Sequence, residues 1–543
     1  MCYNYVYDGF GKLKQVLING EVIRSFGETK QADGSRTATE TLAGGETSTA
    51  KTDAEGRLTE TKRGETVVTN GYTYDEAGRC TGYTEYPNDT TKKKVHIYTY
   101  GELQNSHQVG NATAAYTSDS RGNAATTTYT IAGTVVSTHT FDYEDGLNST
   151  LKSITWNGEV SQHYTHDALG RQTRYVLRDA NGTAFYSRKA SYLKYGDHTT
   201  NLIADLQYQV KGKAADRERY TYDAEGNITA IHENGKLKVR YHYDGLNRLV
   251  REDNQPLKLT TTYTYDNGGN LLRQNEYAYS LSPTDELANG TEVAYTYGNE
   301  NHPDQLTDYN GKAIVYNANG CPTNYLGNTC TYEGGRLKTF GANTFEYDAD
   351  GLRTKKNNIV YTYIDGRLVQ QSGNSKPPLD FIYGPAGLVG FKYDNILYLY
   401  RRNQMGDVTH IYNTAGTRLA KYEYDAWGNH TVTKMGTNTI GDINPIRYRG
   451  YYYDTETGLY YLQSRYYDPE TGRFISQDDT AYLAPESLTG LNLYAAAVPA
   501  LRFPHIRGKQ AETDRSFRYP RGHPEFPSVF PRSDRQSKFR WLA

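Results

Sequence analysis

A nine-residue phrase, Tyr220-Thr-Tyr-Asp-Ala-Glu-Gly-Asn-Ile228, decides the fold of this chain of 543 residues. It returns with small changes at 241–249 and 263–271, in steps of 21 and 22 residues, which lie in the range of known repeat units. Complete or degenerate copies also occupy residues 5–13, 72–79, 116–123, 164–171, 345–353, 361–368 and 422–429. The chain is therefore predicted to be one long repeat array rather than several separate domains.

Each part of the phrase has a local physical meaning. Tyrosines two residues apart lie on one face of a strand, where aromatic pairs stabilise neighbouring strands. The following Asp can accept a backbone N–H in a turn, and the Gly three residues later supplies a positive φ. Arg or Asn, followed by Leu and alternating polar residues, begins the return strand. One repeat is a strand, a turn and a strand, so residues 1 to about 475 are predicted to form an almost all-β meander.

The composition agrees with a sheet that has at least one face exposed to solvent. Apolar residues make up only 36% of the chain, and 53 Tyr outnumber 14 Phe and 3 Trp. One hairpin cannot bury enough surface alone, so successive hairpins must join edge to edge, and a growing twisted sheet must curl. A coiled wall is therefore predicted, and the low apolar fraction permits it to enclose a solvated space. A filled β-solenoid or several sandwiches remain the alternatives that periodicity leaves open.

Near its end the array tightens into a dense motif at residues 448–479, YRGYYYDTETGLYYLQSRYYDPETGRFISQDD. Two similar turns, 454–458 and 468–472, flank a predicted strand over 460–467. Pro469 sets φ in the second turn and Gly472 relieves strain at its end. These residues are interpreted as hairpin chemistry without catalysis. Arg465 and Arg473 are predicted to lie across tyrosine rings or to pair with turn carboxylates.

This motif resembles the RHS repeat-associated core, and the upstream phrases resemble YD repeats. Both occur in RHS proteins, wall-associated proteins, the C subunits of insecticidal toxin complexes and teneurins. The resemblance covers about residues 1–495. It implies a hollow β-shell over 1–440 and a core motif region over 441–495 that forms a plug or inward spiral. It also implies a non-enzymatic container, secreted or on the cell surface, that encloses and delivers a toxic C-terminal polypeptide.

Some members of this family cleave themselves at aspartates in Asp-Pro-x-Gly contexts. Here Asp478-Asp479 is followed by Thr480-Ala481-Tyr482 instead, and the two aspartates would project to opposite faces of a strand. No catalytic residue is therefore assigned, and no cofactor-binding or metal-ligating residue either. The sequence also lacks a phosphate-binding Gly-rich loop, His-Glu-x-x-His and Gly-x-Ser-x-Gly, so an enzymatic function is not expected.

Residues 496–543 differ in kind from the array. Within them, 498–543 carry ten Lys or Arg and four Asp or Glu, although the whole chain has a net charge of −2. Recurrent Pro opposes helices and central strands, and so short a segment seldom folds unaided. We expect a disordered tail that is truncated or frameshifted. A short basic effector and a cargo remnant are the alternatives. His505 and His523 have no recognised catalytic or metal-binding spacing, and nucleic-acid binding is not expected.

Several other expectations concern partners and location. No apolar run is long enough for a membrane helix, and residues 1–8 do not resemble a secretory signal. Because the array starts inside a repeat, upstream repeats are expected to be missing, leaving a strand edge exposed at residues 3–7. Cys321 and Cys330 could form a local bridge. The expected partner is a C-terminal toxin cargo. The alternative function is a tyrosine-rich adhesion module that binds cell-wall polysaccharide or a target-cell surface.

Overall fold

The computed structural model describes residues 2–145, 150–385, 387–478 and 492–495. These residues are almost entirely β-strand, as predicted. The first coil of the sheet contains β1 (Tyr3–Tyr7), β2 (Leu13–Ile18), β3 (Glu21–Lys30), β4 (Arg36–Leu42), β5 (Thr47–Thr52), β6 (Leu58–Arg63), β7 (Thr66–Tyr74), β8 (Cys80–Glu85), β9 (Lys94–Tyr100), β10 (Gln104–Val109), β11 (Ala112–Ser118), β12 (Ala124–Ile131), β13 (Thr134–Tyr143), β14 (Leu151–Trp156), β15 (Val160–His166), β16 (Gln172–Asp179), β17 (Ala184–Tyr195), β18 (His198–Val210), β19 (Asp216–Tyr222), β20 (Ile228–Glu233), β21 (Lys236–Tyr243), β22 (Leu249–Asn254), β23 (Leu259–Tyr265), β24 (Leu271–Ala278) and β25 (Thr291–Thr296).

The second coil and the end of the array follow. They contain β26 (Asp308–Tyr309), β27 (Lys312–Tyr316), β28 (Pro322–Tyr325), β29 (Asn328–Glu333), β30 (Arg336–Phe340), β31 (Asn343–Tyr347), β32 (Arg353–Lys356), β33 (Ile359–Ile364), β34 (Arg367–Gly373), β35 (Lys376–Gly384), β36 (Gly387–Tyr393), β37 (Ile396–Arg402), β38 (Val408–Asn413), β39 (Arg418–Tyr424), β40 (His430–Lys434), β41 (Tyr452–Asp454), β42 (Leu459–Tyr461), β43 (Tyr466–Asp468) and β44 (Arg473–Phe474). Helical segments are limited to η1 (Thr284–Glu286), α1 (Ile440–Ile443) and η2 (Tyr448–Gly450).

The first forty strands form one antiparallel sheet in which each strand pairs with its neighbours in the chain. Within the described ranges β1 and β40 are its two edges, so the wall does not close on itself. The edge predicted at residues 3–7 is therefore present. Strands β41–β44 form a separate antiparallel sheet.

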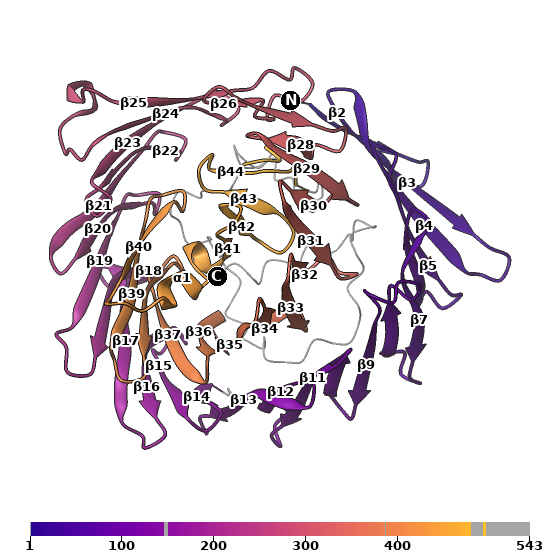
Figure 1. The fold of residues 1–543 in the computed structure, drawn as a ribbon, viewed down its shortest axis with the longest axis horizontal. Helices are drawn as coiled ribbons and strands as arrows, with labels where there is room; N and C mark the ends of the chain where they lie inside the picture. The colour runs from indigo at the N-terminus through magenta and orange to yellow at the C-terminus, as the bar shows by residue number, and fades with distance from the viewer. Residues whose placement is uncertain (1, 146–149, 386, 479–491, 496–543) are drawn as a thin grey trace.

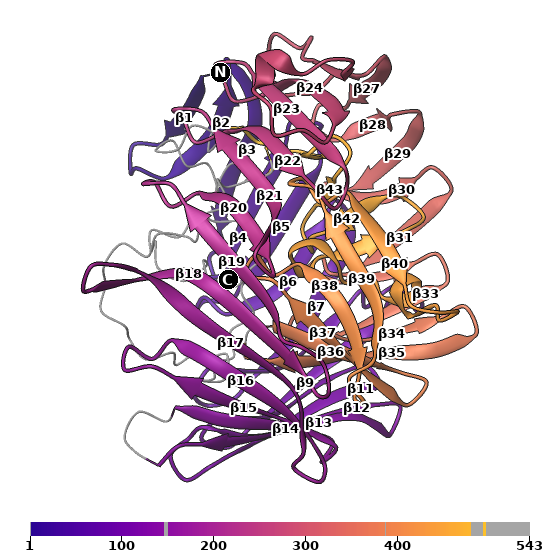
Figure 2. The same ribbon diagram turned by 90° about the vertical axis from the view of Figure 1, so that its left-hand side faces the viewer.

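The wall coils into a partial shell. Viewed down the shortest axis, the first coil runs round the outside, the second coil follows a narrower path, and β41–β44 lie near the centre (Figure 1). Figure 2 shows that the second coil is displaced along that axis, with β28–β35 and β40 on one side of the molecule. This arrangement confirms the predicted coiled meander over the alternative of separate sandwiches.

We call the boundary between the two coils the seam. It begins where Asn19 Nδ2 donates to the carbonyl of Asn301 at 2.8 Å. Farther along, β10 contacts β33 and β13 contacts β35, whereas β22 meets β39 through a 2.8 Å hydrogen bond from Asn254 Nδ2 to the carbonyl of Tyr424. The stretch β10–β22 is thus faced by the shorter stretch β33–β39. The second coil uses fewer strands to cover the same arc, so the shell narrows.

The Asp and Gly of each phrase build the hairpin turn as predicted. In the copy at 220–228, Asp223 Oδ1 accepts the backbone N–H of Asn227 at 2.7 Å, and Asn227 Nδ2 donates to Asp223 Oδ2 at 2.7 Å. Gly226 has a φ of 85°. In the copy at 241–249 the same position is Asn247, with a φ of 62°. Asn tolerates this left-handed conformation better than most residues, so the turn persists without Gly.

In six copies of the phrase, the tyrosine at the third position ties one repeat to the strands before it. Tyr265 donates its hydroxyl to the carbonyl of Leu249 at 2.7 Å. Arg248 pairs with Asp244 at 2.6 Å and lies 4.9 Å from the centre of the Tyr265 ring. The same hydroxyl-to-carbonyl tie is made by Tyr74, Tyr100, Tyr192, Tyr222, Tyr243, Tyr297, Tyr347, Tyr383 and Tyr424. Phenylalanine could not make these ties, because it lacks the hydroxyl.

Replacing Tyr265 with phenylalanine should lower the free energy of unfolding by about 1 kcal/mol, because the hydrogen bond to Leu249 is lost while the ring still packs. Urea denaturation would measure the change. The matched control is Tyr7→Phe on the edge strand β1, where the side chain is 57% exposed. A change within about 0.5 kcal/mol is expected there. Equal losses in the two variants would contradict the tie.

The structure corrects two local predictions. The strand predicted over 460–467 is two strands, β42 and β43, because the chain turns between them and Gln463 has a φ of 62°. Cys321 and Cys330 do not form the bridge considered above, since both are buried free thiols. The tail at 496–543 lies outside the described residues. Among the residues that are described, no helix is long and apolar enough to cross a membrane.

Candidate functional site: the plug and its seat

The sheet of β41–β44 forms a plug against the second coil. Two plug tyrosines, and Tyr448 of η2 just before the plug, donate their hydroxyls to successive carbonyls of one repeat turn: Tyr448 to Ala426 at 2.7 Å, Tyr467 to Trp427 at 2.7 Å and Tyr460 to Gly428 at 2.9 Å. All three side chains are buried. The turn at 425–429 belongs to the last complete phrase of the array. The plug is therefore fixed to the end of the wall by the side chain that also ties the repeats.

A buried ion pair holds the opposite side of the plug. Arg353 of β32 contacts both carboxylate oxygens of Asp454, one of them at 3.1 Å, and both side chains are fully buried. Lys356 Nζ, 3% exposed, donates to Asp454 at 2.8 Å and to the half-exposed Glu456 at 2.7 Å. Burial alone would lower the pKa of Arg353, but Asp454 raises it well above its usual value. The guanidinium therefore stays charged.

Aromatic rings complete the pocket around this guanidinium. Its central carbon lies 4.4 Å from the centre of the Tyr461 ring, 4.7 Å from that of Tyr361 and 5.0 Å from that of Tyr452. Tyr361 belongs to the wall and the other two belong to the plug. The charge of this cation is thus balanced by a carboxylate and by aromatic faces, whereas its buried Nε has no hydrogen-bond partner among the described residues. We call Arg353, Lys356 and Tyr361 the seat.

The second plug aspartate is also buried. Asp468 accepts the hydroxyl of Tyr325 at 2.8 Å and the backbone N–H of Glu470 at 2.9 Å. Burial raises the pKa of Asp468 to about 6. The adjacent backbone is held as well, because Asn429 donates to the carbonyl of Pro469 at 2.8 Å. This Asp-Pro-Glu-Thr-Gly turn is docked on the wall as part of the packing.

The two plug arginines follow the prediction in part. Arg473 lies 5.2 Å from the ring centre of Tyr297 and donates to its hydroxyl at 3.1 Å. Arg465 instead lies over Phe474, at 3.5 Å, and pairs with Asp478 at 2.8 Å. Asp479 lies outside the described residues. Asp478 is thus occupied by an ion pair with Arg465, and the structure gives no geometry for an aspartate pair with its neighbour.

The chain returns to the wall at residues 492–495. Tyr494 is 1% exposed, donates to the carbonyl of Gly320 at 2.8 Å and accepts from Gln305 at 3.1 Å. Leu493 and Tyr494 pack with Val16, Ile18 and Ile23 of the first coil. Ala495 also pairs with Arg473 of the plug. We call residues 492–495 the anchor, because they join the plug, the start of the second coil and the first coil at one point.

The sequence analysis did not identify the seat residues, although the order of residues in one copy of the phrase pointed to Arg353. In most copies Gly is followed by Arg or Asn and then by Leu, but the copy at 345–353 ends Gly351-Leu352-Arg353. The transposition places Arg353 at the position where a buried Leu normally stands, as Leu249 does. A cation in a core position requires a buried counter-charge. The transposition could therefore have pointed to a buried ion pair, though not to its partner.

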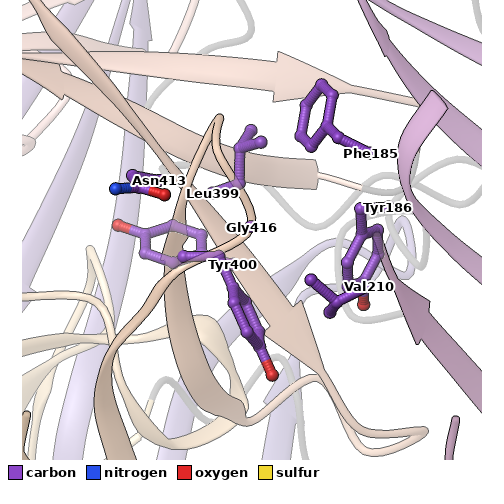
Figure 3. Close-up of a pocket in the computed structure, with 8 residues that line it drawn as sticks. Phe185, Tyr186, Val210, Leu399, Tyr400, Asn413 and Gly416 are labelled. Atoms are coloured by element: carbon purple, nitrogen blue, oxygen red, sulfur yellow. The ribbon is translucent and has the colours of Figure 1, made fainter. Parts of the chain in front are cut away.

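No described group of three or more His, Cys, Asp or Glu side chains is arranged to hold a metal ion. Figure 3 shows a pocket between the coils, lined by Phe185, Tyr186 and Val210 of the first coil and by Leu399 and Tyr400 of the second. Its volume is about 10 Å³, which is close to the minimum that one water molecule needs. This pocket is evidence of close packing across the seam.

Comparison with known proteins supports the family resemblance. The RHS repeat family model matches residues 222–254. The tRNA3(Ser)-specific nuclease WapA of Bacillus spizizenii is 35% identical over 192 residues, which are 32% of this chain and 8% of that protein. The tRNA nuclease WapA of Bacillus subtilis strain 168 is 30% identical over 265 residues, 48% of this chain and 9% of that protein. The chain thus spans less than a tenth of either relative.

Solved structures show the same fold. A structure of the Photorhabdus luminescens Tc holotoxin pore matches with a TM-score of 0.62 at 18% identity, covering 94% of this chain and 30% of that one. A TcdB2–TccC3–Cdc42 structure matches with a TM-score of 0.58 at 18% identity, covering 92% and 30%. The repeat phrase, the coiled antiparallel wall and these matches together define the class. The chain carries repeats of the RHS type and has the fold of the matched toxin-complex structures.

Proposed function

We propose that this chain is a non-enzymatic part of the shell of a secreted or cell-surface RHS-type toxin, which encloses and delivers a C-terminal effector polypeptide. The observation that carries the proposal is the seated plug. The wall narrows along its second coil, and the plug is fastened inside that coil by the Arg353–Asp454 pair and by three tyrosine hydroxyls. A container needs such a closed end, whereas an enzyme would need an accessible reacting group.

The anchor supports the same proposal. Residues 492–495 hold the chain to both coils immediately before residues 496–543. Whatever follows the anchor is therefore tethered at a fixed point of the shell. We propose that the core motif region, 441–495, serves as closure and tether, while residues 1–440 serve as the wall. The relatives named as tRNA nucleases are consistent with an effector beyond the shell, but this chain's own cargo is not implied by theirs.

The tyrosines weigh against the alternative of carbohydrate adhesion. Ten tyrosines, six of them at the third position of a phrase copy, donate their hydroxyls to backbone carbonyls within the wall. Several rings are also covered by arginines of the preceding repeat, as Tyr100 is by Arg79 at 4.5 Å. A ring packed in this way has less free surface for stacking on a sugar. The packed rows therefore favour the container.

Protease protection of a reporter tests the proposal. A flexible, protease-sensitive reporter segment is joined after Ala543, and its digestion is followed by intact mass spectrometry. In the wild-type shell the reporter should be digested at least about tenfold more slowly than the same segment joined before Met1. Breaking the seat with Asp454→Ala should remove that protection. Digestion at equal rates in both positions would contradict enclosure, even if the wall itself resists the protease.

A further inference from the structure

Exposed cations face each other on the outer side of β16–β19. Arg174 of β16 and Lys189 of β17 are directly opposite in the antiparallel ladder, and both are exposed. Arg217 and Arg219 of β19 are also exposed. Glu218, which lies between them in the sequence, is 2% exposed and points toward β37 of the second coil. The four cations, which we call the basic face, therefore lie on the outside of the wall, where Figure 1 shows β16–β19.

Too few acids accompany these cations. Like charges directly opposite each other on adjacent strands have Cβ atoms about 5 Å apart and destabilise a sheet. On the basic face Asp205 lies opposite Arg219 but contacts Arg217, and no described acid forms an ion pair with Arg174, Lys189 or Arg219. The four cations and one acid leave a net charge of +3. In several other places the wall sets an acid opposite a strand cation, as in the pairs Lys51–Glu60, Lys355–Glu346 and Lys392–Asp380.

The charge of the basic face differs from that of the surrounding chain. Residues 1–497 contain more Asp and Glu than Lys and Arg. A local cluster of one sign attracts ligands of the opposite sign over a Debye length, roughly 8 Å at physiological salt. An anionic group placed between Arg174 and Lys189 would turn their repulsion into two charge-assisted contacts. The opposed cations thus cost stability in the free protein and favour a bound anion.

The side chains between the cations indicate which anion fits. One row across the strands consists of Thr165, Arg174, Lys189, Gln207 and Arg217. Neighbouring strands lie about 4.8 Å apart, so the row spans about 14 Å from β16 to β19, and an extended polymer can reach all of it. The row offers hydroxyl and amide groups, which hydrogen-bond to sugar hydroxyls, and contains no aromatic ring on which a nucleic-acid base could stack. An acidic polysaccharide therefore fits this face better than a nucleic acid does.

We propose that the basic face binds an acidic polysaccharide of a cell surface. Arg174, Lys189 and Arg217 bind its anionic groups, and Thr165 and Gln207 contact its hydroxyl groups. The packed tyrosines of the wall take no part, so this contact is independent of the tyrosine-based adhesion considered above. It is also independent of the container function, because the basic face lies on the outside of the wall and the plug lies inside it.

Binding to alginate, a linear polymer of uronic acids, tests the proposal. The full chain is titrated onto immobilised alginate at low salt, and its affinity is measured by biolayer interferometry. Saturable binding that weakens as salt is raised is expected. The Arg174→Gln/Lys189→Gln variant should lose at least about tenfold in affinity. The logarithm of its affinity should also fall less steeply with the logarithm of salt concentration, because fewer cations are neutralised on binding.

Arg273→Gln/Lys355→Gln is the matched control. It removes the same charge from two exposed side chains that each pair with an acid, Glu292 at 3.0 Å and Glu346 at 3.1 Å. Its affinity for alginate should stay within about twofold of the wild type. Urea denaturation without polymer gives a second readout. The free energy of unfolding should stay constant or rise in Arg174→Gln/Lys189→Gln, because a repulsion is relieved, and should not rise in the control, where two ion pairs are lost.

Three outcomes would overturn the proposal. The first is the absence of saturable binding to alginate at low salt. The second is unchanged binding by Arg174→Gln/Lys189→Gln, which would assign the contact to other cations, such as those at 498–543. The third is equally tight binding, at an equal concentration of charge, to single-stranded DNA or to anionic phospholipid vesicles, since the basic face would then recognise charge alone.

Discussion

Replacing Asp454 with alanine should detach the plug from its seat, with a loss of about 3–5 kcal/mol in the free energy that holds it there. The reason is the charge left behind. Arg353 is fully buried and Lys356 is 3% exposed, and Asp454 is the carboxylate that both contact. Without it, one guanidinium remains among tyrosine rings with no counter-ion. Lys356 keeps only Glu456, whose side chain is 43% exposed.

Glu456→Gln is the matched control, because it removes a carboxylate from the same lysine at the rim of the site. An exposed ion pair contributes at most about 1 kcal/mol, so this variant should resemble the wild type. The plug and wall need not unfold together, so the measurement is hydrogen exchange of peptides covering β41–β44 alongside those of β15–β20. Selective loss of protection in β41–β44 is expected for Asp454→Ala. Equal effects of the two substitutions would refute the role of the buried pair.

Acid should destabilise the protein through His139, and His139→Leu should remove that sensitivity. His139 of β13 is 2% exposed, and burial, followed by the charge of Arg367, lowers its pKa to about 3. In the unfolded chain a histidine titrates near 6.5. The unfolded state therefore takes up a proton first as the pH falls. Stability from this residue is complete above about pH 6.5 and is lost progressively toward pH 3, by at most roughly 5 kcal/mol.

Chemical denaturation of wild type and His139→Leu from about pH 7.5 to 4.5 measures this effect. The difference between the two free energies of unfolding should be constant near neutral pH and shift by about 3 kcal/mol in favour of the variant at pH 4.5. Buried carboxyl groups such as Asp468 titrate in both proteins and cancel in the difference. The exposed His198 provides the control, since His198→Leu should follow the wild type. A pH-independent difference for His139→Leu would show that this histidine is not held neutral by burial.

Local features of the wall could be predicted from the sequence because they depend on neighbouring residues. The Asp223 turn and the positive φ at Gly226 both follow from spacing within one repeat. The seam could not be predicted in the same way. Arg401 pairs with Glu218 across 183 residues at 3.0 Å. Which strands meet depends on how many strands complete one revolution, and that number reflects the summed twist of the whole sheet.

In the plug too, some features could be predicted from the sequence and others could not. Its two turns were predicted from Asp, Pro and Gly, and the tyrosine contact of Arg473 was predicted from its surroundings. The break of the 460–467 strand was not, because Gln463 carries the left-handed φ at a position where Gly or Asn would have signalled a turn. The pairing of Arg353 with Asp454 joins residues 101 apart. Only the docked plug brings them together.

The tyrosine ties have a consequence for how such chains change in length. Each tie joins a repeat only to the preceding one, so inserting or deleting a whole repeat would leave every remaining tie intact. The same change would displace all later strands along the circumference and separate cross-seam partners such as Asn254 and Tyr424. The number of repeats is thus not constrained by the ties within a single revolution of the sheet. It becomes fixed once a second revolution packs on the first, because the contacts across the seam then require particular strands to face each other. Because the seam begins at Asn19, duplications along nearly the whole array should be tolerated only in compensated sets.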